Sequence, residues 1–219
     1  MSDAQEFRDT SGEIAVRGFL HLPTKQPDTA MVLTHGAGAN CNAPLLVALA
    51  EAFSASGLTV LRCDLPFRQV RLSGPPPRGS AERDQAGLRV AVNAMQRRVP
   101  GSVFLGGHSY GGRQASMLAA ADPGIVPTLL LPSYPLHPPE RPDQLRTSHF
   151  PQLGTPSLFV SGARDGFATR DEMEAALKLI PVRTELITVP AAGHELTTKK
   201  NRPEVVQMIT AAFCSFAAV

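Results

Sequence analysis

The sequence predicts an α/β fold, a mostly parallel β-sheet with helices on both faces, and three observations support this. Short apolar runs alternate with longer segments in which apolar residues recur every three or four positions, as in strands joined by helices. The run SVFLGGHS at residues 102–109 is typical of a strand buried on both faces. The chain has 219 residues, 43% of them apolar and 18% charged, so one domain covering residues 1–219 is expected.

The expected elements follow from the positions of these runs and of the turn residues between them. An opening hairpin is predicted, with its turn at Thr10-Ser11-Gly12. The further expected strands are residues 14–22, 30–36, 58–66, 102–109, 128–131, 157–161 and 185–189. The expected helices are residues 42–56, 80–98, 111–121, 170–180 and 203–217.

Two segments rich in proline and arginine are expected to be loops. Residues 67–80, FRQVRLSGPPPRGS, contain three consecutive prolines, which exclude a helix. Residues 133–154 form a second segment of this kind, long enough only for a short lid. We therefore expect no large cap domain above the sheet.

The composition excludes several classes of partner and location. The formal net charge is +2 and no run of Lys and Arg stands out, so nucleic-acid binding is not expected. The N-terminus is acidic without an apolar signal segment, and no apolar stretch approaches the ~20 residues of a membrane span. A cytoplasmic protein without a membrane partner is expected. Cys41, Cys63 and Cys214 form no C-x-x-C pair, so free thiols and no metal site are predicted.

The motif GHSYG at residues 107–111 predicts a nucleophilic serine. It fits G-x-S-x-G and lies between an apolar strand and a helix of small residues. A serine on such a sharp strand-to-helix turn needs glycines two positions before and after it, because side chains there would collide. The N–H of Tyr110 is then free to bind a developing oxyanion near the helix N-terminus. The sequence therefore predicts Ser109 as the nucleophile.

Two partners for this serine follow in the order acid, then histidine. Asp165 comes directly after the apolar run SLFV, and His194 lies in PAAGHEL after the strand ELITV. Both sites are expected at the carboxyl ends of strands, beside the serine turn. Asp165 is therefore predicted to orient His194, the general base, with Glu195 and Asp171 as less favoured acids. The remaining histidines considered, expected on the surface or in loops, are His21, His137 and His149.

A second donor for the oxyanion is expected in the glycine-rich turn HGAGA at residues 35–39, which follows the strand AMVLT. Ala37 N–H is the favoured donor, with Gly36 or Gly38 as alternatives. His35 and Gly36 are also candidate substrate contacts. An ordinary turn or a phosphate cradle is the other interpretation, although the Lys-Ser/Thr pair of a nucleotide P-loop is missing.

These motifs resemble the α/β-hydrolase superfamily over nearly the full length of the chain. The match is strongest to small bacterial hydrolases similar to dienelactone hydrolase, within the subgroup related to testis-expressed protein 30. It rests on GGHSYGGRQASMLAA, LLLPSYPLHPPERPDQLRTSHF and PSLFVSGARDGF. The resemblance implies an α/β-hydrolase fold with a mostly parallel sheet of eight strands (or seven), no cofactor, and hydrolysis of carboxylic esters or related acyl groups. Dienelactone hydrolases use a cysteine nucleophile, whereas position 109 is Ser, so a dienelactone substrate is not implied.

The function expected from these residues is that of a serine hydrolase that cleaves a small carboxylic ester through an acyl-enzyme. A thioesterase or a peptidase with the same three residues is one alternative. The other is a catalytically idle interaction protein, because the wider subgroup includes chromatin-complex proteins. The oligomeric state is left open.

Arginines in the two loops are candidate ligands for an anionic ester, because Arg binds carboxylates in a bidentate manner. The alternative is that they are solvated or paired with Asp64 or Glu82. The arginines considered as substrate ligands are Arg68, Arg71 and Arg146.

Overall fold

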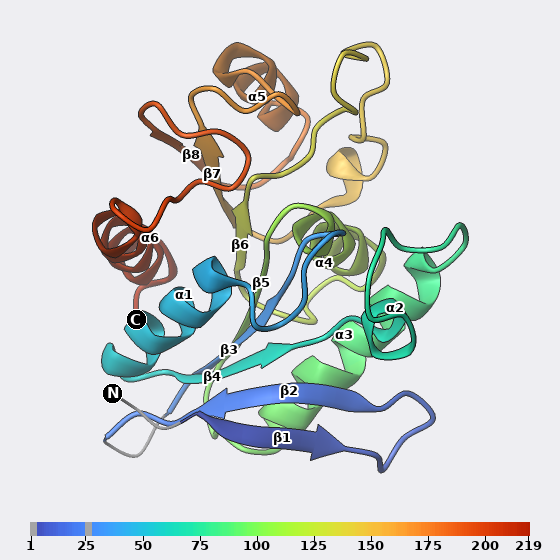
Figure 1. Ribbon diagram of the computed structural model, residues 1–219, viewed down its shortest axis with the longest axis vertical. Coiled ribbons are helices and arrows are strands. Elements are labelled where there is room, and N and C mark those ends of the chain that lie inside the picture. The colour runs from blue at the N-terminus through green and yellow to red at the C-terminus, as the bar shows by residue number, and fades with distance from the viewer. Residues whose placement is uncertain (1–3, 25–27) are drawn as a thin grey trace.

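The computed structural model describes residues 4–24 and 28–219, and in them eight strands form one sheet (Figure 1). The order across the sheet is β1-β2-β4-β3-β5-β6-β7-β8. The strands are β1 (Gln5–Asp9), β2 (Val16–His21), β3 (Ala30–Thr34), β4 (Thr59–Cys63), β5 (Val103–Gly107), β6 (Leu129–Pro132), β7 (Ser157–Gly162) and β8 (Thr184–Val189). The predicted α/β class and the count of eight strands are confirmed.

The sheet is antiparallel at one edge and parallel elsewhere. Strand β1 pairs with β2, and β2 with β4, in antiparallel fashion, which confirms the opening hairpin. All further pairs, from β4 to β8, are parallel. The carboxyl ends of these strands therefore meet along one edge, where ligands bind in open α/β sheets.

Helices cover both faces of the sheet (Figure 1). Helices α1 and α6 pack against one another on one face, and α3 and α4 do so on the other. The helices are α1 (Pro44–Ala55), α2 (Pro66–Val70), α3 (Ala81–Gln96), α4 (Tyr110–Ala121), α5 (Arg170–Leu177) and α6 (Arg202–Ala217), with a 3-10 helix at Phe150–Gln152.

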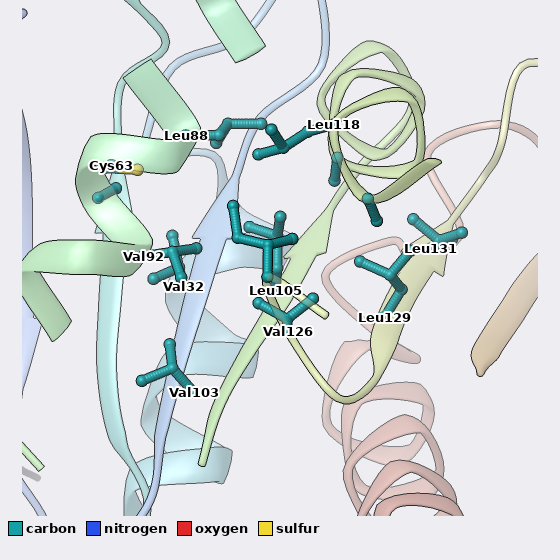
Figure 2. Close-up of a cluster of buried hydrophobic side chains, with 14 of the residues drawn as sticks. Val32, Cys63, Leu88, Val92, Val103, Leu105, Leu118, Val126, Leu129 and Leu131 are labelled. Atoms are coloured by element: carbon teal, nitrogen blue, oxygen red, sulfur yellow. The ribbon is translucent and has the colours of Figure 1, made fainter. Parts of the chain in front are cut away.

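The central strands are apolar throughout because each face meets a different layer of helices. On β3, Val32 belongs to the cluster under α3 and α4, whereas Met31 and Leu33 belong to the cluster under α1 and α6. Strand β5 divides in the same way, with Leu105 on the first face and Phe104 on the second. Figure 2 shows the first cluster, in which side chains of these strands meet Leu88, Val92 and Leu118 from the covering helices.

The segment after β4 corrects one prediction. Residues 67–80 were expected to be entirely a loop, but Pro66–Val70 form the short helix α2. Pro66 occupies the first turn, where the missing N–H costs no hydrogen bond. The three prolines come only at residues 75–77, after this helix has ended. The three prolines therefore exclude a helix only in the second half of the segment.

The segment between β6 and β7 contains no large cap among the described residues. Its longest regular element is the 3-10 helix at Phe150–Gln152. Tyr134 and Phe150 are fully buried in the core cluster under α4. Residues 133–137 and Phe150 are thus anchored in the core, whereas residues 139–145 between them are exposed.

The expectation of a surface or loop position is wrong for His21, whose side chain is buried on a strand, whereas His137 lies in the loop after β6 as expected but with its side chain buried. His21 lies on β2 and its Nε2 accepts a hydrogen bond of 2.9 Å from Nε of Arg62. His149 is half-buried, with Nε2 2.8 Å from the hydroxyl of Ser116. The side chains of His21 and His149 thus form hydrogen bonds with residues of neighbouring elements, Arg62 on β4 and Ser116 on α4.

The predicted free thiols are found in the structure: Cys41 and Cys63 are buried and Cys214 is partly so. None of the helices in the described residues has the length and apolar character needed to cross a membrane.

Candidate active site

The predicted nucleophile lies on a strained turn between β5 and α4. Ser109 has φ 52° and ψ −116°, a conformation rare for a residue with a side chain. A Cβ on Gly107 would lie 2.5 Å from the carbonyl carbon of Gly111, and one on Gly111 would lie 2.6 Å from the oxygen of His35. Only glycine fits at these two positions. The turn that the motif predicted is therefore present, and it places Ser109 after the carboxyl end of β5, where the residue lines a cavity.

The structure brings Ser109, His194 and Asp165 together into one hydrogen-bonded chain. Nε2 of His194 lies 2.8 Å from Oγ of Ser109. Nδ1 of the same ring lies 2.9 and 3.0 Å from the two carboxylate oxygens of Asp165. Because a carboxylate only accepts, Nδ1 carries the proton and Nε2 is left to accept from the serine hydroxyl. This is the arrangement in which a serine can lose its proton as it attacks.

The position of His194 is fixed by its neighbours on three sides. The ring of Phe167 stacks on the imidazole with centroids 4.0 Å apart. The backbone carbonyl of His194 accepts hydrogen bonds from Oγ of Ser133 at 2.6 Å and from Nε2 of His108 at 3.1 Å. Asp165 is buried and also accepts the N–H of Phe167 at 2.9 Å. The imidazole is therefore oriented before any substrate binds.

The two alternative acids lie elsewhere. Glu195 borders the cavity beside Ser109, but no hydrogen bond joins it to His194 in the described residues. Asp171 lies in the first turn of α5. The contacts of the imidazole favour Asp165 over both.

The glycine-rich turn after β3 packs directly against Ser109. A Cβ on Gly36 would lie 3.4 Å from Cβ of Ser109. In the part of the chain that the structure describes, neither Ala37 nor Tyr110 uses its backbone N–H in a hydrogen bond. Ala37 lines the same cavity as Ser109, and Tyr110 follows Ser109 in sequence.

His35 does not line the cavity, although the sequence suggested it as a substrate contact. It is fully buried, its Nδ1 donates to the oxygen of Gly36 at 2.9 Å, and its Nε2 accepts the N–H of Leu65 at 3.1 Å. Burial lowers the pKa of this imidazole and keeps it neutral. Its hydrogen bonds hold the turn in place.

Beside Ser109 lies a cavity of about 540 Å³. Small backbone-rich residues of the turn after β3 and the start of α1 form much of its wall, with Phe167 contributing a ring. Its charged side chains are those of Glu195 and Arg202. The lining residues are Gly36, Ala37, Gly38, Ala39, Ala43, Pro44, Leu45, Leu46, His108, Ser109, Phe167, His194, Glu195, Thr197 and Arg202.

The structure does not bring the three loop arginines to this cavity. Arg68 is buried and donates to four backbone carbonyls. Arg71, the residue that follows α2, is exposed. Arg146 donates to the oxygen of Pro135 at 3.3 Å. In the described residues none of the three forms an ion pair with Asp64 or Glu82 either. Arginine type and loop position were too weak a signal, because backbone carbonyls compete for the same donors.

Sequence reasoning missed Arg202 and Phe167 as cavity residues. Phe167 could have been found from its place two residues after Asp165, in the same loop. Arg202 begins α6, only eight positions after His194 in sequence, but the path of the intervening loop is not readable from residue types.

The comparisons with known proteins agree with this architecture. A family model described as an alpha/beta hydrolase domain matches residues 27–218. The chain belongs to the alpha/beta hydrolase family. The resemblance drawn from the sequence motifs is thereby confirmed at the level of the family.

Solved structures share the α/β-hydrolase fold with this protein at low identity. An alpha-beta serine hydrolase homologue from Coxiella burnetii is 17% identical, covers 97% of this chain and 98% of its own, and has a TM-score of 0.77. Dienelactone hydrolase from Anabaena variabilis is 23% identical, with 97% and 98% covered and a TM-score of 0.73. Est1E from Butyrivibrio proteoclasticus, solved with ferulic acid bound, is 16% identical, with 97% and 100% covered and a TM-score of 0.79.

The close backbone packing at the serine turn predicts that Gly107→Ala destabilises this α/β hydrolase. The added methyl meets backbone atoms of α4 that cannot move without displacing the helix, so the free energy of unfolding should fall by about 1–3 kcal/mol. Gly154→Ala is the matched control, because a Cβ there meets open space. Its effect should stay within about 0.5 kcal/mol. Chemical denaturation measures both, and equal stabilities of the two variants would contradict the packing argument.

Proposed function

We propose that this α/β hydrolase is a serine hydrolase that cleaves a small carboxylic ester through an acyl-enzyme. The observation that carries the proposal is the hydrogen-bonded chain from Asp165 through His194 to Ser109, which opens on a cavity of about 540 Å³. In the described residues no hydrogen bond uses the backbone N–H of Ala37, which lines this cavity, or that of Tyr110, which follows Ser109. A nucleophile, a base with its orienting acid, and oxyanion donors are the parts that acyl transfer requires.

The proposed reaction has two halves. Nε2 of His194 takes the hydroxyl proton of Ser109 while Oγ attacks the acyl carbon, and the resulting oxyanion accepts hydrogen bonds from the N–H groups of Ala37 and Tyr110. Collapse of this intermediate breaks the ester C–O bond, and the imidazolium returns its proton to the leaving alkoxide. Water then attacks the acyl-enzyme with the same proton transfers and releases the acid and free Ser109. Asp165 stabilises the imidazolium in each half.

The first prediction from the proposed function concerns the nucleophile. Ser109→Ala should abolish labelling by a fluorophosphonate probe and all ester hydrolysis while the protein remains folded, because alanine fits the same turn. Mass spectrometry of the labelled wild-type protein should place the adduct on Ser109. An adduct on another serine would overturn the assignment. Complete absence of labelling in the folded wild type would instead favour an interaction protein that retains the fold.

A panel of matched esters, thioesters and amides separates the ester proposal from a thioesterase or peptidase with the same residues. The panel should include an ester of a hydroxycinnamic acid, since Est1E, which shares the fold, was solved with ferulic acid. The highest kcat/KM is expected for an ester, because a cavity of this volume accommodates a small acyl group better than a polypeptide.

The second prediction concerns the orienting acid. Asp165→Asn should lower kcat by about 10⁴-fold, because an amide in place of the carboxylate favours the imidazole tautomer with the proton on the wrong nitrogen. Asp171→Asn, which removes the same charge from the exposed first turn of α5, is the matched control and should leave kcat unchanged. Steady-state kinetics decide the matter. A loss below tenfold in Asp165→Asn would show that another group orients His194.

The third prediction concerns the charge of the substrate. Arg202 is half-buried at the cavity, its Nε lies 3.4 Å from Oγ1 of Thr197, and no ion pair joins it to a carboxylate in the described residues. Such a guanidinium favours an anionic ligand. A nitrophenyl monoester of a dicarboxylic acid should therefore show a higher kcat/KM than a neutral nitrophenyl ester of equal length. Arg202→Gln should reduce this preference about tenfold or more.

Two further variants control this prediction. Arg71→Gln removes a cation outside the cavity and should keep the preference. Glu195→Gln removes the one carboxylate among the cavity residues and should increase it. Equal kcat/KM values for the neutral and anionic esters in the wild type would contradict an anionic substrate and leave the ester reaction itself untouched.

A further inference from the structure

Arg68 is a buried cation whose partners are all backbone carbonyls. Only 3% of its surface is exposed. Nε donates to the oxygen of Ala39 at 2.7 Å, and Nη2 donates to the oxygens of Ala37 at 2.7 Å and Gly74 at 2.8 Å. Nη1 donates to the oxygen of Arg71 at 2.9 Å. No ion pair joins it to an Asp or Glu in the part of the chain that the structure describes.

This arrangement needs an explanation, because an unpaired buried charge costs several kcal/mol unless hydrogen bonds replace its hydration. Here the planar guanidinium reaches two carbonyls of the turn after β3 and two of the segment that follows α2. Lysine could not span them, since its donors radiate from a single atom. Within residues 36–39 no side chain is long enough to hold the backbone, and the oxygen of Gly36 accepts from Ala39 N–H at 3.1 Å and from Nδ1 of His35 at 2.9 Å. Arg68 therefore provides much of what holds the turn.

The same contacts determine where the proposed oxyanion donor points. In a trans peptide the C=O and the following N–H point in opposite directions. The oxygen of Gly36, whose peptide carries the N–H of Ala37, is held by His35 and Ala39. The oxygen of Ala37, on the next peptide, is held by Arg68. Hydrogen bonds to their carbonyl oxygens thus fix both peptides that flank the Cα of Ala37.

We propose that Arg68 is a positioning residue for the oxyanion site: it ties down the turn at residues 37–39 so that the N–H of Ala37 stays directed at the substrate oxygen. Its unpaired positive charge also favours the negative charge that develops there, since low local dielectric strengthens such interactions. Arg68 touches no reacting atom and acts through the backbone. The inference rests on the proposed function, because it assumes that Ala37 binds an oxyanion.

The test compares Arg68→Lys and Arg68→Gln with the wild type in steady-state ester hydrolysis. Loss of the aligned donor should lower kcat about 10²–10³-fold, the effect of removing one oxyanion donor, while KM changes by less than about threefold. Affinity for a trifluoromethyl ketone, whose serine adduct carries an oxyanion, should fall by a similar factor. Affinity for the alcohol product, which is neutral and carries no oxyanion, should stay unchanged. A merely structural role would not separate these two affinities.

Arg78→Lys is the matched control, because this exposed arginine lies in the same segment and takes part in none of these contacts. It should behave as wild type in every measurement. If Arg68→Lys and Arg68→Gln unfold, the proposal is tested by chemical rescue: Arg68→Ala is assayed with added guanidinium ion, which can occupy the place of the missing side chain. Guanidinium should then restore kcat and trifluoromethyl ketone affinity together, in a saturable manner, and restoration of folding without kcat would overturn the proposal.

Two results separate this inference from the proposed function. A wild-type protein without esterase activity or fluorophosphonate labelling would defeat the function. An active wild type, an inactive Ser109→Ala and folded Arg68 variants with kcat within about threefold of wild type would defeat only the positioning role.

Discussion

The close approach of backbone to backbone at the turn after β5 is the constraint on which the rest of the site depends. Ser109 is held at a positive φ because its N–H donates to the oxygen of Pro132 on β6 while the N–H of His108 donates to the oxygen of Thr34 on β3. These two hydrogen bonds join the turn to both neighbouring strands. They offset a conformational strain of about 1–3 kcal/mol and keep the serine at the edge where the neighbouring strands also end.

The parallel sheet then determines which distant residues can reach that serine. Asp165 follows β7 and His194 follows β8, and both strands run in the direction of β5. Residues 85 positions apart in sequence, Ser109 and His194, come within hydrogen-bond distance for this reason. Ser133 follows β6, which lies between β5 and β7, and its hydroxyl donates to the carbonyl of His194. Successive strand ends thus contribute the residues around the imidazole.

The parts of the site that could be predicted from the sequence are those for which neighbouring residues in the chain give the signal. The glycines two positions before and after Ser109 identify the serine turn from five consecutive residues. Asp165 and His194 are likewise identified by the apolar runs that precede them by a few residues. Arg68 shows the opposite case: whether a loop arginine faces substrate, solvent or a carbonyl depends on tertiary structure that residue type does not reveal. The short helix α2 that presents it was hidden by the prolines that follow. Arg202 was missed because its approach depends on the path of the loop after His194.

The two buried histidines of the site explain how positive charge is distributed around it. Burial lowers the pKa of both His35 and His108, so each stays neutral near neutral pH. Neutrality is required at His35, because protonation would remove the Nε2 acceptor and leave the buried N–H of Leu65 without a partner. His108 likewise serves as a donor to the carbonyl of His194 without adding a charge beside the imidazole. Two arginines of the described residues keep their charge at the site: Arg68, which binds the carbonyl of Ala37, and Arg202, which lines the cavity. In the proposed reaction these guanidinium groups, and not the buried histidines, are the fixed positive charges that favour the developing oxyanion.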